Sequence, residues 1–313
     1  MATSSLQANL STQANTSQPY LPIQTHVQLI QITIYIPTFI LGLLFNGMAM
    51  WFAFHKIKKL TEPVIYMVSL MILDTLVLFA LPFKMISYSE NTWELGGIFC
   101  SFLESLYFVN MYGSILISTC ICVDRYIALL HPFVAVTLRS PKKAAITCAI
   151  ISAGVWAGTA YTYQFHGPQD RMLCFYGFSG TIWKSRALLI ILETAFLACL
   201  TAMIFCTVQI NTSLRRNQRG DDPLTIRSKL VNIIMANLAT FTVCFTPFHV
   251  ALVLYHQVKN QTLDDGQEII RTFLQISLCW ANLNCFLDAI SYYFVFDESL
   301  KLSSTETNTT NVV

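Results

Sequence analysis

The chain has 313 residues, of which 54% are hydrophobic and only 12% charged, and its formal net charge is +2. Soluble domains carry about 25% charged residues, so this composition excludes an ordinary soluble protein and indicates an integral membrane chain. A net charge this small gives no support to a nucleic-acid partner.

Seven hydrophobic stretches are long enough to cross a bilayer as helices, which takes about 17 to 25 residues each. In chain order they cover Leu29 to Phe54, Val64 to Ile86, Ile98 to Leu130, Ala144 to Tyr163, Ala187 to Ile210, Leu230 to Tyr255 and Ile269 to Val295. The apolar runs are continuous, which favours helices over a β-barrel, because every backbone polar group needs a partner within lipid. We therefore expect an all-α membrane protein, a bundle of seven transmembrane helices.

Basic residues are unevenly divided between the two sides of this predicted bundle. Thirteen of the 19 Lys and Arg fall on one side, and the first 55 residues contain none. The positive-inside rule places the Lys/Arg-rich side in the cytoplasm and the N-terminus outside. We predict an extracellular tail over residues 1–26, a transmembrane domain over residues 27–296 and a short cytoplasmic tail over residues 297–313.

The predicted outer side carries residues that are modified in an oxidising compartment. Asn9 and Asn15 stand in Asn-X-Ser/Thr sequences, so we expect N-glycosylation there, although so short a motif also arises by chance. Most of the ten cysteines fall at membrane depth and are typical of small buried apolar residues. Only Cys100 and Cys174 are expected outside, and we predict a disulfide between them.

An adjacent acid and base close the third predicted helix, at Asp124, Arg125 and Tyr126. A charge at membrane depth costs roughly 2.5 to 3.5 kcal/mol on insertion scales, so such residues are typically functional. The alternative is a pair that snorkels at a helix end. The triplet indicates a switch at the inner edge of the membrane.

Together the motifs resemble those of the rhodopsin-like (class A) G protein-coupled receptors, over nearly the whole chain. The resemblance is carried by Asn46, Leu70, Asp74, Cys100, Asp124, Arg125, Tyr126, Trp156, Phe241, Cys244, Phe245, Pro247, Asp288 and Tyr292. The sequences of residues 81–85, 106–114, 138–143 and 284–294 resemble most closely those of the receptors for lysophosphatidylinositol, and next those of the receptors that respond to kynurenate. It implies a glycoprotein receptor of the plasma membrane that signals through heterotrimeric G proteins of the Rho-activating class. Arrestin is a second expected partner, because the tail is rich in Ser and Thr that phosphorylation would make negative.

The resemblance also implies a sodium ion in the middle of the bundle. Its ligands would be Asp74, Ser114, Asn284 and Asp288. The last two are four residues apart and share a helical face, and a bound cation lets buried carboxylates stay charged. A water-filled hydrogen-bond network is the alternative, and no other cofactor or metal is expected.

The resemblance assigns the inner switch to eight residues: Asp124, Arg125, Tyr126, Pro132, Phe133, Phe245, Pro247 and Tyr292. Arg125, paired with Asp124 at rest, would swing toward a G protein when the sixth helix moves about Pro247. Pro132 and Phe133 resemble the loop plug that fits a G protein groove, with an ordinary turn as the alternative. The chain departs from the family pattern at Ala289, where a proline normally kinks the seventh helix, so that bend must come from elsewhere.

The outer half of the bundle is predicted to hold an anionic, partly lipidic ligand. The predicted pocket residues are Lys84, Glu104, Tyr107, Phe108, Met111, Phe248, His249, Arg271 and Phe273. Lys84, with Glu104 as its partner, lies ten residues beyond Asp74 and so about 15 Å further out along its helix. Snorkelling is the alternative for Lys84, and a satisfied core histidine is the alternative for His249. Tyr107 stands where amine receptors carry Asp, which disfavours an amine ligand.

Other function classes find little support in the residues. The chain has no P-loop, HExxH or paired CxxC sequence, so no enzymatic constellation is visible. A retinal pigment needs a lysine in the last helix, and none stands between Lys259 and Lys301. A receptor for a small aromatic or carboxylic acid metabolite and a non-signalling decoy receptor are the alternatives that stay open.

Overall fold

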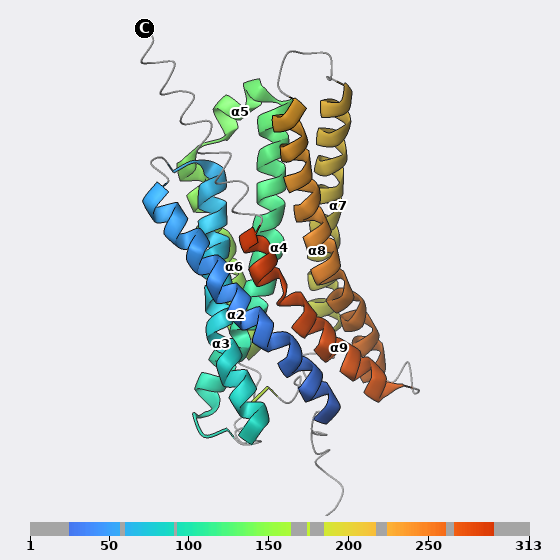
Figure 1. Ribbon diagram of the computed structural model, residues 1–313. Coiled ribbons are helices and arrows are strands. Elements are labelled where there is room, and N and C mark those ends of the chain that lie inside the picture. The colour runs from blue at the N-terminus through green and yellow to red at the C-terminus, as the bar shows by residue number, and fades with distance from the viewer. Residues whose placement is uncertain are drawn as a thin grey trace, which may run out of the picture.

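The computed structural model describes residues 25–56, 60–90, 93–163, 174–175, 185–216, 224–260 and 266–290 (Figure 1). The helices in this part of the chain are α2 (Thr25–Lys56), α3 (Glu62–Glu90), α4 (Gly97–Leu130), α5 (Pro132–Leu138), α6 (Pro141–Tyr163), α7 (Arg186–Arg216), α8 (Leu224–Lys259) and α9 (Gln267–Ala281). Seven spans among the described residues are long and apolar enough to cross a membrane, which confirms the predicted bundle. Asn9, Asn15, Tyr292 and the two predicted tails beyond these ranges lie outside the described residues.

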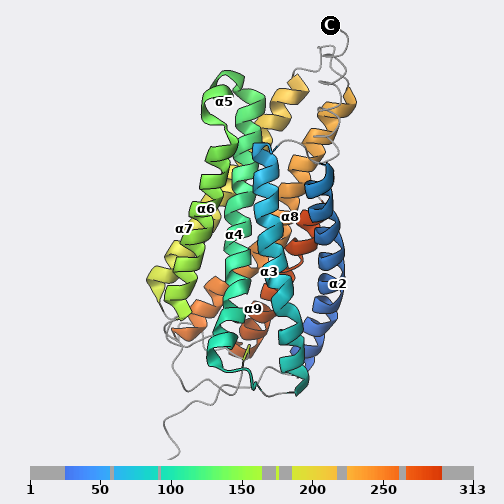
Figure 2. The same cartoon turned by 90° about the vertical axis from the view of Figure 1, so that its left-hand side faces the viewer.

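Helix α4 is the central element of the bundle. It packs against α3, α6 and α7, and more lightly against α5 and α8. Figure 2 shows α4 between α3 and α6, and α2 on the far side of α3. Helices α6 and α7 both pack on α4 but make few contacts with each other among the described residues. The bundle is therefore less tightly closed between α6 and α7 than elsewhere.

Glycine allows the closest approach between α3 and α4. A Cβ atom built on Gly113 would lie 2.5 Å from Cδ1 of Leu73, which is closer than real side chains come. The side chain of Leu73 therefore occupies the space that any larger residue at position 113 would need. This close packing brings the buried polar residues of the two helices within hydrogen-bonding reach of each other.

A turn interrupts the helix of the seventh predicted span. Helix α9 ends at Ala281, residues 282–283 form a turn, and residues 284–290 are helical again. Across the turn the backbone bonds span three residues, from Asn282 N to Cys279 O and from Cys285 N to Asn282 O, both at 3.2 Å. Such tight turns interrupt the four-residue ladder of an α-helix and bend it. The predicted seventh span is confirmed as far as Ile290, and the turn within it supplies the bend that was expected from elsewhere than Ala289.

Candidate ligand cavity, central network and inner switch

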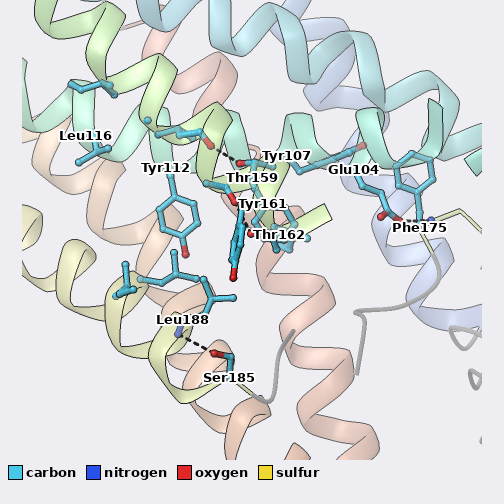
Figure 3. Close-up of a pocket in the computed structure, with 18 of the residues that line it drawn as sticks. Glu104, Tyr107, Tyr112, Leu116, Thr159, Tyr161, Thr162, Phe175, Ser185 and Leu188 are labelled. Atoms are coloured by element: carbon cyan, nitrogen blue, oxygen red, sulfur yellow. Dashed lines mark hydrogen bonds between the residues drawn. The ribbon is translucent and has the colours of Figure 1, made fainter. Parts of the chain in front are cut away.

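A cavity of about 720 Å³ lies within the bundle (Figure 3). Ligand sites commonly measure about 300 to 1,000 Å³, so this volume suits a small molecule or part of a lipid. Of the predicted pocket residues, Lys84, Glu104, Tyr107 and Phe108 line it. The rest of the wall is mainly apolar and comes from α4, α6 and α7, with contributions from α2 and α9.

Lys84 lies at one end of the cavity inside a cage of aromatic rings. Its Nζ donates a hydrogen bond to the Tyr35 hydroxyl at 2.9 Å, and its residue is only 5% exposed. The same nitrogen lies over four rings, those of Tyr35, Tyr88, Tyr107 and Phe175, at 4.6 to 5.9 Å from their centroids. Ring faces attract a cation, so the cage stabilises a charge that has left water. The buried position is not that of a snorkelling lysine.

Glu104 interacts electrostatically with Lys84, as predicted, and it also has a backbone partner. Its Oε1 accepts a hydrogen bond from the backbone N of Phe175 at 2.9 Å, and the hydrogen-bond acceptor of Lys84 is Tyr35. Phe175 has a backbone φ of 68°, which is rare for a bulky residue. The hydrogen bond that Phe175 donates to Glu104 holds this strained residue, and the Phe175 ring lies edge-on to Tyr107 at the Lys84 end of the cavity.

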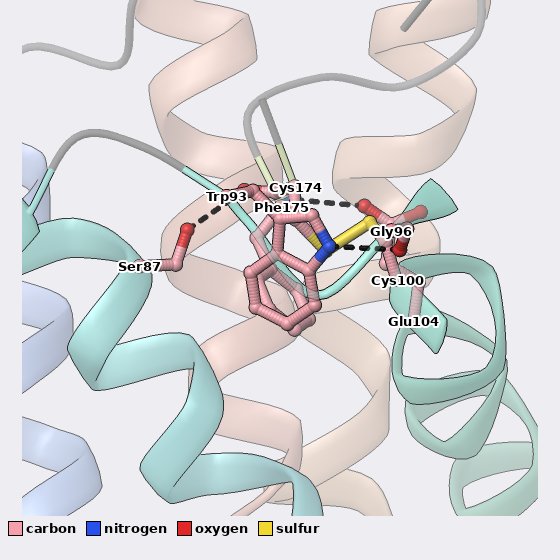
Figure 4. The surroundings of a disulfide bond; sticks show 7 residues. All are labelled: Ser87, Trp93, Gly96, Cys100, Glu104, Cys174 and Phe175. Atoms are coloured by element: carbon pink, nitrogen blue, oxygen red, sulfur yellow. Dashed lines mark hydrogen bonds between the residues drawn. A yellow bond between two sulfur atoms is a disulfide. The ribbon is translucent and has the colours of Figure 1, made fainter. Parts of the chain in front are cut away.

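The predicted disulfide between Cys100 and Cys174 is present and fixes this outer wall (Figure 4). Cys174 is completely buried, and its carbonyl oxygen accepts a hydrogen bond from Ser87 Oγ at 3.2 Å. Because Phe175 is the next residue, the bridge and the Glu104 contact together position one wall of the aromatic cage. The disulfide thereby connects α3 and α4 to the ligand cavity.

Five predicted pocket residues are not among those that line the cavity. Met111 and Phe248 are buried in the hydrophobic core between α4, α7, α8 and α9. His249 is buried as well, with Nδ1 3.0 Å from Oε1 of Glu193. Arg271 and Phe273 are on α9, where Phe273 is exposed on the outside of the bundle.

The cavity reaches the lipid-facing surface between α6 and α7. Ile150, Tyr161 and Ile191 line the cavity and are 67%, 65% and 63% exposed. Figure 3 shows Tyr112 of α4 and Tyr161 of α6 directed toward the same space. Gly154 and Gly158 of α6 also line it, and a Cβ atom at either would meet nothing within 4 Å. The cavity is therefore open sideways, which hydropathy could not predict because it depends on how two helices are spaced.

Several polar atoms of the cavity wall lack a partner within the described part of the chain. They are Oε1 of Gln31 and the hydroxyl oxygens of Tyr107 and Tyr112, all buried from solvent. Buried polar groups are almost always hydrogen-bonded, so unpaired ones in a cavity indicate groups that a ligand or water satisfies. Gln31 was missed by sequence reasoning. Its position as a polar residue within a long apolar stretch was the signal that could have indicated it.

The four predicted sodium ligands lie on the facing sides of α3, α4 and the segment after α9. Asp74 Oδ1 accepts a hydrogen bond from Asn110 Nδ2 at 2.9 Å, and Asp288 Oδ2 accepts one from Asn284 Nδ2 at 2.6 Å. Oδ2 of Asp74 and Oγ of Ser114 are buried without a protein partner in the described structure. Two carboxylates and unpaired oxygens fit a hard cation, and a sodium ion there stays a prediction. Asn110 was missed, although it stands one turn before Ser114 and so shares its face.

The inner end of the bundle contains an ion-pair cluster around Asp124. Both carboxylate oxygens of Asp124 accept hydrogen bonds from Arg139, at 2.7 and 3.0 Å, and Arg139 also donates to Glu62 at 3.2 Å. Burial alone would lower the pKa of Arg139, but its contacts with Asp124 and Glu62 outweigh burial and raise that pKa. The pairing of Asp124 with Arg125 stays a prediction. Sequence reasoning missed Arg139, which stands outside any apolar stretch.

The remaining switch residues lie where a partner or a moving helix could contact them. Pro132 begins the short helix α5, and the side chain of Phe133 beside it is almost fully exposed. On α8, Phe245 is buried and packs edge-on against Phe241, two residues before Pro247. The roles of these four residues in G protein activation stay predictions.

Known proteins resemble this chain over most of its length. Residues 45–292 match the family described as 7 transmembrane receptor (rhodopsin family). G-protein coupled receptor 55 from Mus musculus is 36% identical over 284 residues, which cover 86% of this chain and 86% of that receptor. Lysophosphatidic acid receptor 6 from Gallus gallus is 32% identical over 280 residues, which cover 84% of this chain and 89% of that receptor. The seven spans and the family match agree, and the chain belongs to the rhodopsin family of seven-transmembrane receptors.

Proposed function

We propose that this multi-pass membrane receptor is activated by an anionic lysophospholipid such as lysophosphatidylinositol. We also propose that it signals through heterotrimeric G proteins of the Rho-activating class, with arrestin as a further partner. Members of its family are receptors and not enzymes, so the cavity is a recognition site and carries out no reaction. The observation that carries the ligand proposal is the caged ammonium of Lys84 in a cavity that opens toward lipid.

The two parts of the cavity suit the two parts of a lysophospholipid. The phosphodiester of lysophosphatidylinositol has two free oxygens that can accept from the Lys84 ammonium, and a charge-assisted contact of this kind is about twice as strong as a neutral hydrogen bond. An acyl chain would pass along Ile150 and Ile191 to the surface between α6 and α7. A lipid could then bind from the membrane without first entering water. Two relatives are named as receptors for lysophosphatidic acid, whose chemistry has the same two parts.

A small acid metabolite is the second candidate ligand. It would use Lys84 in the same way, because a carboxylate also accepts from an ammonium. It would leave the opening between α6 and α7 unfilled, and it would have to enter from the water. Sensitivity to acyl-chain length therefore separates the two candidates.

The test is a panel of lysophospholipids and small acids applied to expressing cells, with sensors for each class of G protein. Lysophosphatidylinositol should stimulate the sensor for the Rho-activating class. A response to a small acid alone would replace the ligand proposal. Surface expression and ligand binding without G protein activation would make the protein a decoy receptor.

Lys84 variants test the anion anchor at matched surface expression. A charge-assisted contact is worth roughly 1.5 to 3 kcal/mol, so Lys84→Met should weaken the response to lysophosphatidylinositol by about tenfold to a hundredfold. Methionine retains most of the length and the apolar stem of lysine, so the variant loses the charge and the hydrogen bond to Tyr35 but little packing. Lys84→Arg should retain part of the response. Arg271→Ala is measured beside it, because Arg271 is the other cation among the predicted pocket residues. An unchanged response in the Lys84→Met, Arg271→Ala double variant would contradict an anionic ligand.

A further inference from the structure

Three polar side chains from three helices meet beside the cavity, away from Lys84. Tyr112 is on α4 and lines the cavity, Glu193 is on α7, and His249 is on α8. The Tyr112 and His249 rings meet edge to face, with their centroids 6.0 Å apart. The ring of His249 also stacks on Phe196 at 3.8 Å, which fixes its plane.

Glu193 determines what His249 can offer to a ligand. Oε1 of Glu193 is 3.0 Å from Nδ1 of His249, and an ionised carboxylate can only accept, so Nδ1 carries the proton. In the neutral imidazole the other nitrogen, Nε2, is then a hydrogen-bond acceptor. Nε2 is buried and has no partner among the described residues, and the same is true of the Tyr112 hydroxyl.

The charge of Glu193 excludes an anion from this end of the cavity. A phosphate or carboxylate beside Glu193 would meet a like charge in surroundings that screen it poorly. A neutral hydroxyl group has the donor and the acceptor that the two unpaired atoms lack, because it can donate to Nε2 of His249 while it accepts from the Tyr112 hydroxyl. The cavity thus has a cationic end at Lys84, and at Tyr112 a polar wall with His249 behind it.

We propose that Tyr112 and His249, oriented by Glu193, form a subsite for the free glycerol hydroxyl of a lysophospholipid. This proposal rests on the proposed function, since it names the second polar group of the same ligand. A diacyl phospholipid carries an ester in place of that hydroxyl and cannot donate to Nε2 from this position. The subsite therefore selects lysophospholipids from the diacyl lipids that make up the surrounding bilayer. It also connects the ligand to α8 two residues beyond Pro247, inside the helix that carries the predicted kink.

The first experiment compares two probes on purified wild-type receptor and on Tyr112→Phe. The probes are oleoyl lysophosphatidylinositol and its analogue with hydrogen in place of the free glycerol hydroxyl. The loss of one buried hydrogen bond corresponds to about tenfold in affinity, so wild type should prefer the hydroxylated probe by that factor. Tyr112→Phe removes one of the two contacts of the ligand hydroxyl and leaves the one to His249, so its preference for the hydroxylated probe should be clearly smaller than that of wild type. Equal binding of both probes to wild type, or a preference that is undiminished in Tyr112→Phe, would overturn the subsite.

Tyr161→Phe is the matched control. It also removes the hydroxyl of a tyrosine that lines the cavity, but Tyr161 lies on the lipid-facing side of α6. The control should retain the preference for the hydroxylated probe. Loss of the preference in both variants would mean that the cavity as a whole is disturbed, and would count against Tyr112 as the specific contact.

A second measurement needs no ligand and separates the two proposals. In the ligand-free receptor in detergent, Tyr112→Phe removes an unpaired buried hydroxyl, so its melting temperature should equal or exceed that of wild type. A lower melting temperature would show that the hydroxyl makes a hydrogen bond within the protein that stabilises the fold, and would overturn the subsite. If wild type binds neither probe, the proposed function fails, and this measurement still decides whether the Tyr112 hydroxyl is structurally satisfied.

Discussion

The guanidinium of Arg139 holds the carboxylate of Asp124 through two hydrogen bonds, from Nε at 2.7 Å and from Nη2 at 3.0 Å. Asp124 is the acid of the inner triplet near the end of α4, and Arg139 lies in the short connection between α5 and α6. Since Nη2 also donates to Glu62 at the beginning of α3, one side chain connects three parts of the inner surface. This cluster holds α5, with its exposed Phe133, in one position relative to α3 and α4.

The first prediction is that Arg139→Ala raises basal signalling. Without the guanidinium, Asp124 and Glu62 lose their shared partner, and two like charges remain close to each other. Removal of one partner from a hydrogen-bonded charge should destabilise the receptor by about 1 to 3 kcal/mol and loosen α5. Ligand-free nucleotide exchange on a purified G protein should increase. Arg215→Ala is the control, because Arg215 is exposed and its hydrogen bond among the described residues is to Asn211 of its own helix. Basal exchange that stays at the wild-type rate in Arg139→Ala would contradict the role of this cluster.

The second prediction concerns the outer disulfide. Cys100→Ala, Cys174→Ala and the double variant should all reduce surface expression strongly and to the same degree, because a bridge contributes about 2 to 4 kcal/mol. Cys148→Ala, which removes a buried free cysteine on α6, should have a much smaller effect. Flow cytometry of an N-terminally tagged receptor measures this. A double variant that is much worse than either single variant would indicate separate roles for the two cysteines.

Hydropathy and charge sufficed to predict the seven membrane spans, because a bilayer restricts a chain to a few allowed structures. The disulfide followed from topology, since only two cysteines were expected on the oxidising side. The contacts between helices could not be predicted from hydropathy or topology, because they depend on which faces of two helices pack together. The pair of Glu193 and His249 joins residues 56 positions apart, and Arg139 was one of many basic residues on the inner side. The turn at Asn282 and Leu283 was also missed. It contains neither glycine nor proline, the residues that usually indicate a turn in a sequence.

The third prediction tests the central network for sodium. Oδ2 of Asp74 and Oγ of Ser114 are the unpaired oxygens there, so Asp74→Asn and Ser114→Ala should weaken an ion site. Allosteric coupling is typically about fivefold or more in affinity, so agonist binding to wild type should weaken by that factor when sodium replaces an organic cation. Both variants should lose this sensitivity. Ser118→Ala, one turn further along α4 and also buried, should retain it. Equal agonist affinity of wild type in the two salts would leave the water-filled network as the correct interpretation.

The fourth prediction tests the opening between α6 and α7 as the route of the acyl chain. Gly154 and Gly158 line the cavity where it meets lipid, and a side chain at either position has room, so Gly158→Leu should fold and fill part of the opening. Displacement of two buried methylene groups at about 0.8 kcal/mol each corresponds to roughly tenfold weaker binding. The response to oleoyl lysophosphatidylinositol should fall by that factor, and less for a short-chain analogue that does not reach the opening. Gly47→Leu is the matched control, because Gly47 is exposed on α2 with nothing within 4 Å and gains the same helix propensity. An equal loss in the control, or a loss that does not depend on chain length, would mean that the acyl chain takes another route.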